Sequence, residues 1–225
     1  GGKSGAVRIP PGRLAPGNEI VMDDGPSTLA MYSVWVYWLG VLVMTVKVRL
    51  QGAASAVMIP KQPLERLMWI VWVPVIATWI VSPWASIHRS TSPSWRLPDA
   101  AIVETSWYAL RWVAAGLTVA CLAATIFCWR WMGRNWRVAV DADQANELIV
   151  TGPFSRVRHP IYTLSMVMMI ATLAAVPIWP LLAASLLHIA LMHFKALNEE
   201  RAMLLMHGEV YAGYRERTGR FLPRI

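Results

Sequence analysis

Hydrophobic positions along this chain gather in long stretches that polar segments separate. Residues 27–46 and 67–87 contain no Asp, Glu, Lys or Arg, and residues 108–131 carry only Arg111 and Arg130 near their ends. An α-helix rises about 1.5 Å per residue, so it needs about 20 apolar residues to cross roughly 30 Å of hydrocarbon. Each of these three stretches therefore predicts one membrane-spanning helix, with the two arginines reaching toward the membrane surface.

A fourth uncharged stretch, residues 160–194, is too long for one span, and Pro177 and Pro180 interrupt it. Prolines this close together break a helix. The pattern predicts a tight hairpin of two helices, 161–176 and 181–198, which pack as antiparallel neighbours because their connection is short. The fold class expected is all-α: a polytopic membrane helix bundle with about five transmembrane helices.

Composition supports lipid as the solvent of these helices. The chain is 56% hydrophobic and only 15% charged, whereas soluble domains are about 45–50% apolar and about 25% charged. The 13 Trp residues suit the boundary between membrane and water. The net charge of +8 is better explained by basic residues at cytoplasmic helix ends than by nucleic acid, which we do not expect as a partner.

The basic residues also predict the orientation. With five spans, 15 of the 21 Lys and Arg fall on the side that holds residues 47–66, 130–160 and the tail from 195. Cytoplasmic loops carry the excess of positive charge. We therefore expect a multi-pass protein whose 130–160 loop and C-terminal tail face the cytoplasm and together form a pocket for a soluble cofactor.

Three regions are expected. Residues 1–26 are a polar N-terminal segment, 27–131 hold the first three membrane helices, and 132–225 hold the chemistry and the last two. No metal is expected, because Cys121 and Cys128 match no zinc spacing, and His188 and His193, five apart, do not share a face as an i,i+4 pair does.

The hairpin should bring residues 158–162 close to residues 198–201. Pro160 suits the first turn of a helix, which leaves His159 at its start, and a helix N-terminus attracts an anionic group such as a carboxylate. Glu199 and Glu200, just past the fifth span, could hold a cationic ligand. Taken alone, each element is better explained as a headgroup anchor or a solvated pair than as a binding site. Together, with Arg158, they fit a ligand with an amino group, a carboxylate and a sulfonium, such as S-adenosylmethionine.

Six runs of residues stand out in the C-terminal half, over about residues 133–223. They are Gly133-Arg134-Asn135-Trp136, Asn146-Glu147-Leu148-Ile149-Val150-Thr151-Gly152-Pro153-Phe154, Val157-Arg158-His159-Pro160-Ile161-Tyr162, Glu199-Glu200, Gly208-Glu209-Val210-Tyr211-Ala212-Gly213-Tyr214 and Phe221-Leu222-Pro223. In their order and spacing, these runs resemble the isoprenylcysteine carboxyl methyltransferase family, within the phospholipid methyltransferase superfamily.

The resemblance implies a methyl-donor site closed by the loop and the tail. It assigns cofactor contacts to Asn146, Glu147, Leu148, Ile149, Phe154, His159, Pro160, Tyr162 and Glu199. It also implies that Lys195, where the family usually has Arg, contacts the acceptor. The family commonly has His at position 146 and Tyr at position 154, and here Thr163-Leu164 replace a small residue after the Tyr.

The function expected is transfer of a methyl group from S-adenosylmethionine, which leaves S-adenosylhomocysteine, to a lipophilic or small acceptor. If the acceptor is a carboxylate or thiolate, Lys195 or Arg201 could orient it and no base is required. If it is an amine, a Glu or His159 is the candidate base. The chain lacks the G-x-G-x-x-G context of a Rossmann-like sheet. A sterol-type membrane reductase using NADPH and a non-enzymatic membrane scaffold are the alternatives.

Overall fold

The computed structural model describes residues 24–50, 63–88, 95–97, 105–133 and 148–224. Within these ranges the chain is mostly helical, and its only extended pairings are two isolated bridges. The helices are α1 (Asp24–Leu50), α2 (Pro63–His88), α3 (Thr105–Met132), the 3-10 helix η4 (Gly152–Ser155), α4 (Pro160–Ala175) and α5 (Trp179–Arg217). The predicted all-α class is therefore confirmed.

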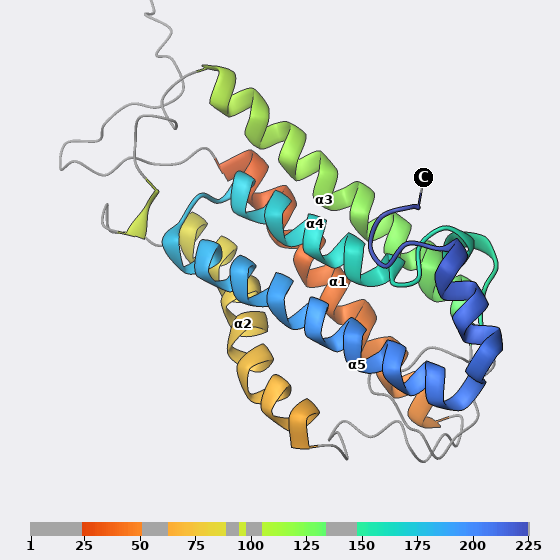
Figure 1. Cartoon of the computed structure of the whole chain (residues 1–225). Coiled ribbons are helices and arrows are strands. Elements are labelled where there is room, and N and C mark those ends of the chain that lie inside the picture. The colour runs from red at the N-terminus through yellow and green to blue at the C-terminus, as the bar shows by residue number, and fades with distance from the viewer. Residues whose placement is uncertain (1–23, 51–62, 89–94, 98–104, 134–147, 225) are drawn as a thin grey trace, which may run out of the picture.

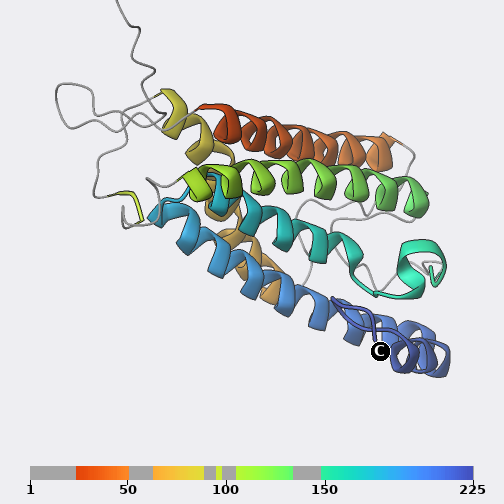
Figure 2. The same ribbon diagram turned by 90° about the horizontal axis from the view of Figure 1, so that it is seen from above.

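The five long helices run in alternate directions through one bundle (Figures 1 and 2). The ends of α1, α3 and α5 and the starts of α2 and α4 lie toward the same end, which we call the site end. α4 contacts α1, α3 and α5, and α2 contacts α1 and α5. The predicted antiparallel hairpin of α4 and α5 is confirmed, and its turn is Val176-Pro177-Ile178.

Four helices, α1, α2, α3 and α5, are long and apolar enough to cross a membrane. The fifth, α4, has 16 residues, and at about 1.5 Å per residue it is somewhat short for roughly 30 Å of hydrocarbon. Large apolar side chains such as Ile70 and Val113 are 71% and 68% exposed on the outer faces. Such faces are stable against lipid, so the chain is a multi-pass membrane protein.

Helix α5 does not end near residue 198, as the sequence pattern predicted, but continues to Arg217. The charged residues from Glu199 onward end the apolar span, yet they are good helix formers and do not end the helix. The helix bends at Gly208, where φ is +49°, a backbone conformation that glycine adopts without steric cost. The bend turns the last part of α5 back toward the start of α4 (Figure 1).

Arg111 is a buried side chain of the bundle, whereas the prediction made it an anchor at the membrane surface. Helix α3 begins at Thr105, so Arg111 lies well inside the bundle and is only 4% exposed. Its guanidinium donates to the Ala175 carbonyl at 2.9 Å and to the Ser27 hydroxyl at 2.9 Å. A charge in this position needs such partners, because lipid offers none. Arg111 therefore joins the end of α4 to the start of α1.

His188, a second buried polar residue between the helices, also has side-chain partners. His188 is 1% exposed, accepts a hydrogen bond at Nδ1 from the Trp72 indole at 3.3 Å and lies 3.2 Å from the Ser165 hydroxyl at Nε2. His193 is exposed on another face of α5, so the two histidines do not converge. Cys121 and Cys128 are buried free thiols.

Candidate functional site

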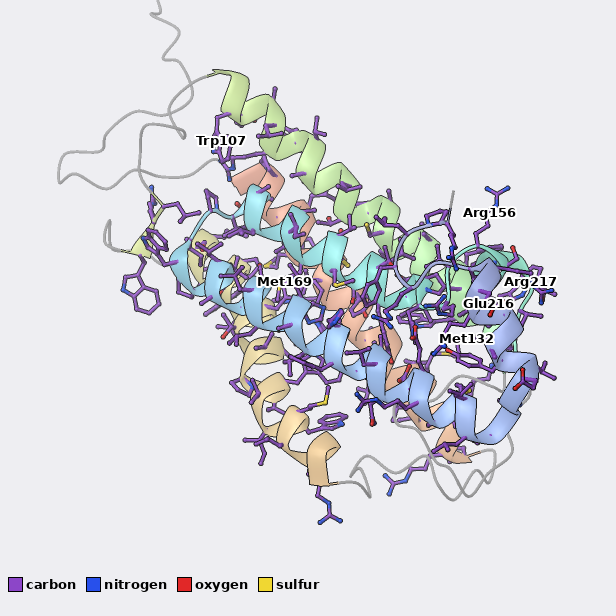
Figure 3. The ribbon with its side chains drawn as sticks, in the orientation of Figure 1. Trp107, Met132, Arg156, Met169, Glu216 and Arg217 are labelled. Atoms are coloured by element: carbon purple, nitrogen blue, oxygen red, sulfur yellow. The ribbon has the colours of Figure 1, made fainter. Side chains whose placement is uncertain are left out.

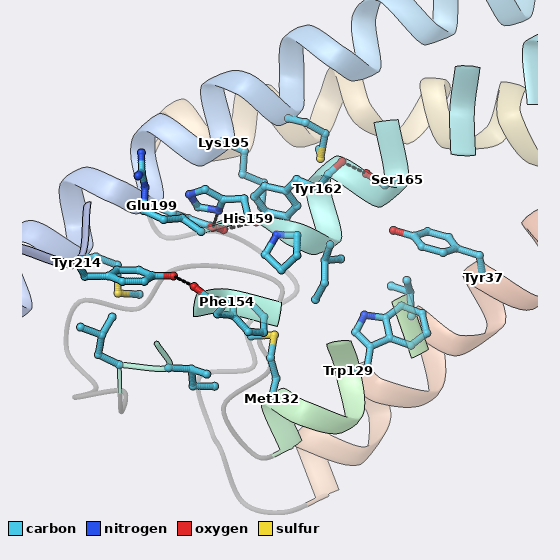
Figure 4. Close-up of a pocket in the computed structure, with 18 of the residues that line it drawn as sticks. Tyr37, Trp129, Met132, Phe154, His159, Tyr162, Ser165, Lys195, Glu199 and Tyr214 are labelled. Carbon is cyan, nitrogen blue, oxygen red and sulfur yellow. Dashed lines mark hydrogen bonds and ion pairs between the residues drawn. The ribbon is translucent and has the colours of Figure 1, made fainter. Parts of the chain in front are cut away.

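A cavity of about 220 Å³ opens at the site end of the bundle (Figure 4). All five long helices contribute to its wall, together with the segment that precedes α4. Aromatic residues form a large part of the wall, and they are Tyr37, Trp38, Trp72, Trp129, Phe154, Tyr162, Tyr211 and Tyr214. Its charged or titratable lining side chains among the described residues are Arg158, His159, Lys195 and Glu199, beside tyrosine.

The C-terminal tail, residues 218–224, folds over the start of α4. The backbone N–H of Arg158 donates to the Gly219 carbonyl at 2.9 Å, and that of His159 donates to the Arg220 carbonyl at 3.1 Å. The Thr163 hydroxyl donates to the Phe221 carbonyl at 2.8 Å. Pro160 begins α4 with His159 as its N-cap, as predicted. The two amides before Pro160 are therefore committed to the tail, and not to a bound anion.

Replacing Gly219 with alanine is expected to displace this tail. A Cβ at this position would lie 1.7 Å from the Leu222 carbonyl oxygen, which is far inside van der Waals contact. We expect faster tryptic cleavage within the tail and a lower melting temperature. Gly213→Ala is the matched control, because a Cβ there meets nothing within 4 Å and alanine suits a helix better than glycine. Equal cleavage of the two variants would contradict the tight packing at Gly219.

Glu199 presents its carboxylate to the cavity. The Tyr162 hydroxyl donates to one carboxylate oxygen, and His159 Nδ1 lies 3.6 Å from the other. The His159 ring stacks on the Tyr162 ring, with centroids 5.3 Å apart and planes 7° apart. The predicted proximity of residues 158–162 to residues 198–201 is thus observed, and Figure 4 shows these three side chains together.

Glu200, by contrast, points away from the cavity, and it does not line it. Its carboxylate accepts from Arg158 Nε at 3.0 Å and from Arg220 Nε and Nη2 at 2.9 and 2.8 Å, while His159 Nε2 lies 3.4 Å away. This hydrogen bonding raises the pKa of Arg220. The predicted cofactor contact of Glu200 is not supported by its position, because both its oxygens bind the arginines that fasten the tail.

The basic residues near the site differ in whether their charged groups can reach a ligand in the cavity. Arg158 lines the cavity, but its guanidinium also donates to the Arg215 and Thr218 carbonyls. Lys195 lines the cavity, with Nζ 5.6 Å from the centroid of the Trp72 ring. Arg201 is exposed and does not line the cavity. Of the two cations predicted to act on the acceptor, only Lys195 is brought to the cavity.

The remaining predicted cofactor residues fall into two groups. Those that line the cavity are Leu148, Ile149, Phe154, Pro160 and Tyr162. Phe154 is fixed by the Tyr214 hydroxyl, which donates to its carbonyl at 2.6 Å. Asn146 and Glu147 lie outside the described residues.

Sequence reasoning did not identify several lining residues. Tyr211 and Tyr214 stand in the C-terminal run that carries the family resemblance, so their spacing could have indicated them. Tyr37, Trp38 and Trp129 lie in apolar helices, where an aromatic residue facing a cavity has the same sequence pattern as one facing lipid. Their part in the wall is visible only in the structure.

Comparison with known proteins bears on this site. Residues 109–209 match the sequence model of a family described as phospholipid methyltransferase. The matched segment covers most of α3, all of α4 and α5 as far as the bend, so it includes His159, Tyr162 and Glu199.

The chain is also similar to an individual protein, the nickel-cobalt-cadmium resistance protein NccN of Alcaligenes xylosoxydans xylosoxydans. It is 31% identical over 116 residues, which cover 51% of this chain and 53% of that protein. The chain thus spans about half the length of this relative. In the part of the chain that the structure describes, no group of three or more His, Cys, Asp or Glu is arranged to hold a metal ion.

Proposed function

We propose that this chain is a membrane methyltransferase that uses S-adenosylmethionine as its methyl donor, because residues 109–209 match the phospholipid methyltransferase family model. The observation that carries the proposal is the cavity in which Glu199 faces His159 and Tyr162 beneath the folded tail. The acceptor is a lipophilic or small molecule with a carboxylate, thiol or amine.

The chemistry of the lining suits this donor. Glu199 offers a carboxylate to an amino group, and the faces of aromatic side chains such as Phe154 and Tyr211 can stack on a planar base and attract a sulfonium. Asn146 and Glu147 are proposed to add further contacts, with Leu148 and Ile149. When bound, the donor supplies an electrophilic methyl group on sulfur.

The chain itself positions and desolvates the reacting groups. The aromatic wall excludes water, so an anionic acceptor loses hydration that would slow its attack. Lys195 orients such an acceptor, and no base is needed. For an amine acceptor, Glu199 or His159 would take the proton. The exposed Arg201 serves only an acceptor group that approaches from outside the cavity.

We propose that the cavity and the tail face the cytoplasm. The charge bias of the loops supports this orientation, as does the presence of Arg130, Arg156 and the tail arginines at the site end. The donor would then enter from the cytosol, and a lipophilic acceptor from the bilayer.

Ligand binding separates this proposal from its alternatives. A nicotinamide cofactor needs cations for its pyrophosphate, but Arg158, one of two cations in the described lining, is held by Glu200 and the tail. S-adenosylhomocysteine and NADPH should be added separately to the purified protein. We expect stabilisation only by the former, of about 2.7 kcal/mol at 100 times its Kd. Stabilisation only by NADPH would indicate a reductase, and stabilisation by neither would indicate a scaffold.

Lys195→Ala is expected to lower methyl transfer to acceptors in native membrane extract by about 10- to 100-fold, since it removes one charged contact. Labelled S-adenosylmethionine measures this transfer. The affinity for S-adenosylhomocysteine should change little. Lys195→Arg, the residue usual in the similar family, is the matched control and should retain activity. If the variant lost donor affinity as much as transfer, Lys195 would contact the donor and not the acceptor.

A further inference from the structure

A second groove, of about 600 Å³, is lined by the C-terminal tail and the end of α5. Arg158 is the one described residue that this groove shares with the cavity of the candidate site. Four arginines line it: Arg158, Arg215, Arg220 and Arg224. One carboxylate, that of Glu216, and the apolar residues Leu222 and Pro223 complete the described wall with Thr218 and Gly219.

The positive charge of this arginine groove is only partly neutralised. Arg158 and Arg220 share the Glu200 carboxylate, which contacts them at 3.0 and 2.8 Å. Arg215 pairs with no carboxylate among the described residues, and the guanidinium of Arg224 donates to the backbone carbonyl of Glu216. Figure 3 shows that the exposed Arg156 and Arg217 lie at the same end of the molecule. Arginine forks of this kind favour bidentate binding of phosphate oxygens.

The position of the arginine groove along the bundle indicates the source of such a phosphate. The groove residues Thr218 to Arg220 lie beside Arg158 and His159 through backbone hydrogen bonds, immediately before the apolar helix α4 begins. This is the level at which a membrane helix meets the headgroups.

Apolar side chains accompany the arginines. Leu222 in the groove wall is 73% exposed, and Leu205 and Val210, on either side of the bend in α5, are 89% and 70% exposed. A surface that combines arginines with exposed leucines binds the boundary of a membrane, because it satisfies both the phosphate and the acyl chain.

We propose that the arginine groove binds the headgroup phosphate of an anionic phospholipid of the surrounding membrane. The phosphate lies among Arg215, Arg220 and Arg224, and the glycerol and acyl chains run along Leu222. This site does not depend on methyl transfer. It affects the donor cavity nonetheless, because Arg158 lines both spaces and a bound phosphate reduces the repulsion among the arginines that hold the tail.

The test uses the full chain in bilayer nanodiscs of phosphatidylcholine with phosphatidylglycerol. After extraction into mild detergent, native mass spectrometry measures the phosphatidylglycerol that the protein retains. The double variant Arg215→Gln, Arg224→Gln is expected to bind it roughly 30-fold more weakly, since each arginine near an anionic surface contributes about 1 kcal/mol. These exposed arginines leave the Glu200 contacts in place, and the melting temperature in phosphatidylcholine alone checks folding.

The matched control is Lys47→Gln, Arg49→Gln, which removes the same charge from the exposed last turn of α1 at the same end. It should retain the lipid as the wild type does. Equal retention by all three proteins, or equal loss in both double variants, would overturn the proposal, since the lipid would then respond to no site or to charge in general. Complete displacement by inorganic phosphate would overturn the assignment to a lipid. None of these measurements uses the methyl donor, so they are independent of the proposed function.

Discussion

Replacing Glu199 with alanine is expected to weaken binding of S-adenosylhomocysteine by about 100-fold or more, because truncating one partner of a buried charge pair costs about 2–5 kcal/mol. Glu199 is the one carboxylate in the described wall of the cavity. Its removal also breaks the hydrogen bond that the Tyr162 hydroxyl donates to this carboxylate. Titration calorimetry on the purified protein measures the affinity, and the melting temperature without ligand should fall only slightly.

Two further variants make this result specific. Glu199→Gln keeps the size and an acceptor for Tyr162 but loses the charge, so it should bind weakly if the charge itself holds the amino group. Glu209→Gln, on the exposed part of α5 after the bend, removes the same charge away from the cavity and should leave the affinity unchanged. If Glu199→Ala binds as the wild type does, the donor does not lie against Glu199.

Much of the fold follows from features that are local in the sequence. Residues 27–46 and 67–87 can only be buried in lipid, because they carry no charge over a membrane's width. Pro177 and Pro180 place the turn of the hairpin within a residue or two of its observed position. The hydropathy pattern does not predict that α5 continues beyond residue 198, because it shows only where the apolar span ends. The helix itself continues for as long as its residues favour helical backbone geometry.

The candidate site was only partly predictable. Proximity of His159 and Tyr162 to Glu199 follows from two antiparallel helices with a short turn, and the structure shows it. Which of two neighbouring glutamates faces the cavity does not follow. Successive residues of a helix point about 100° apart, and the choice depends on Arg220, which approaches Glu200 from 20 residues further along the chain.

Replacing Glu200 with glutamine is expected to destabilise the protein by about 3 kcal/mol, the lower end of the cost of breaking a buried ion pair. The variant leaves Arg158 and Arg220 beside each other without the carboxylate that both contact. Arg220 retains 29% exposure of its side chain and can turn partly to water, so the higher end of that range is not expected. Unfolding in denaturant measures the loss, and tryptic cleavage should quicken in the tail.

The roles of Glu199 and Glu200 are distinguished by which property each variant loses first, donor affinity or protection of the tail. Glu199→Ala should lose the donor while the tail stays protected, whereas Glu200→Gln should release the tail first and lose donor affinity only as a consequence. A double-mutant cycle of Glu200→Gln with Arg220→Gln should give a coupling energy within about 0.5–3 kcal/mol, because each single change removes the same contact. Additive losses, with the tail as resistant to trypsin as in the wild type, would mean that Glu200 does not fasten the tail.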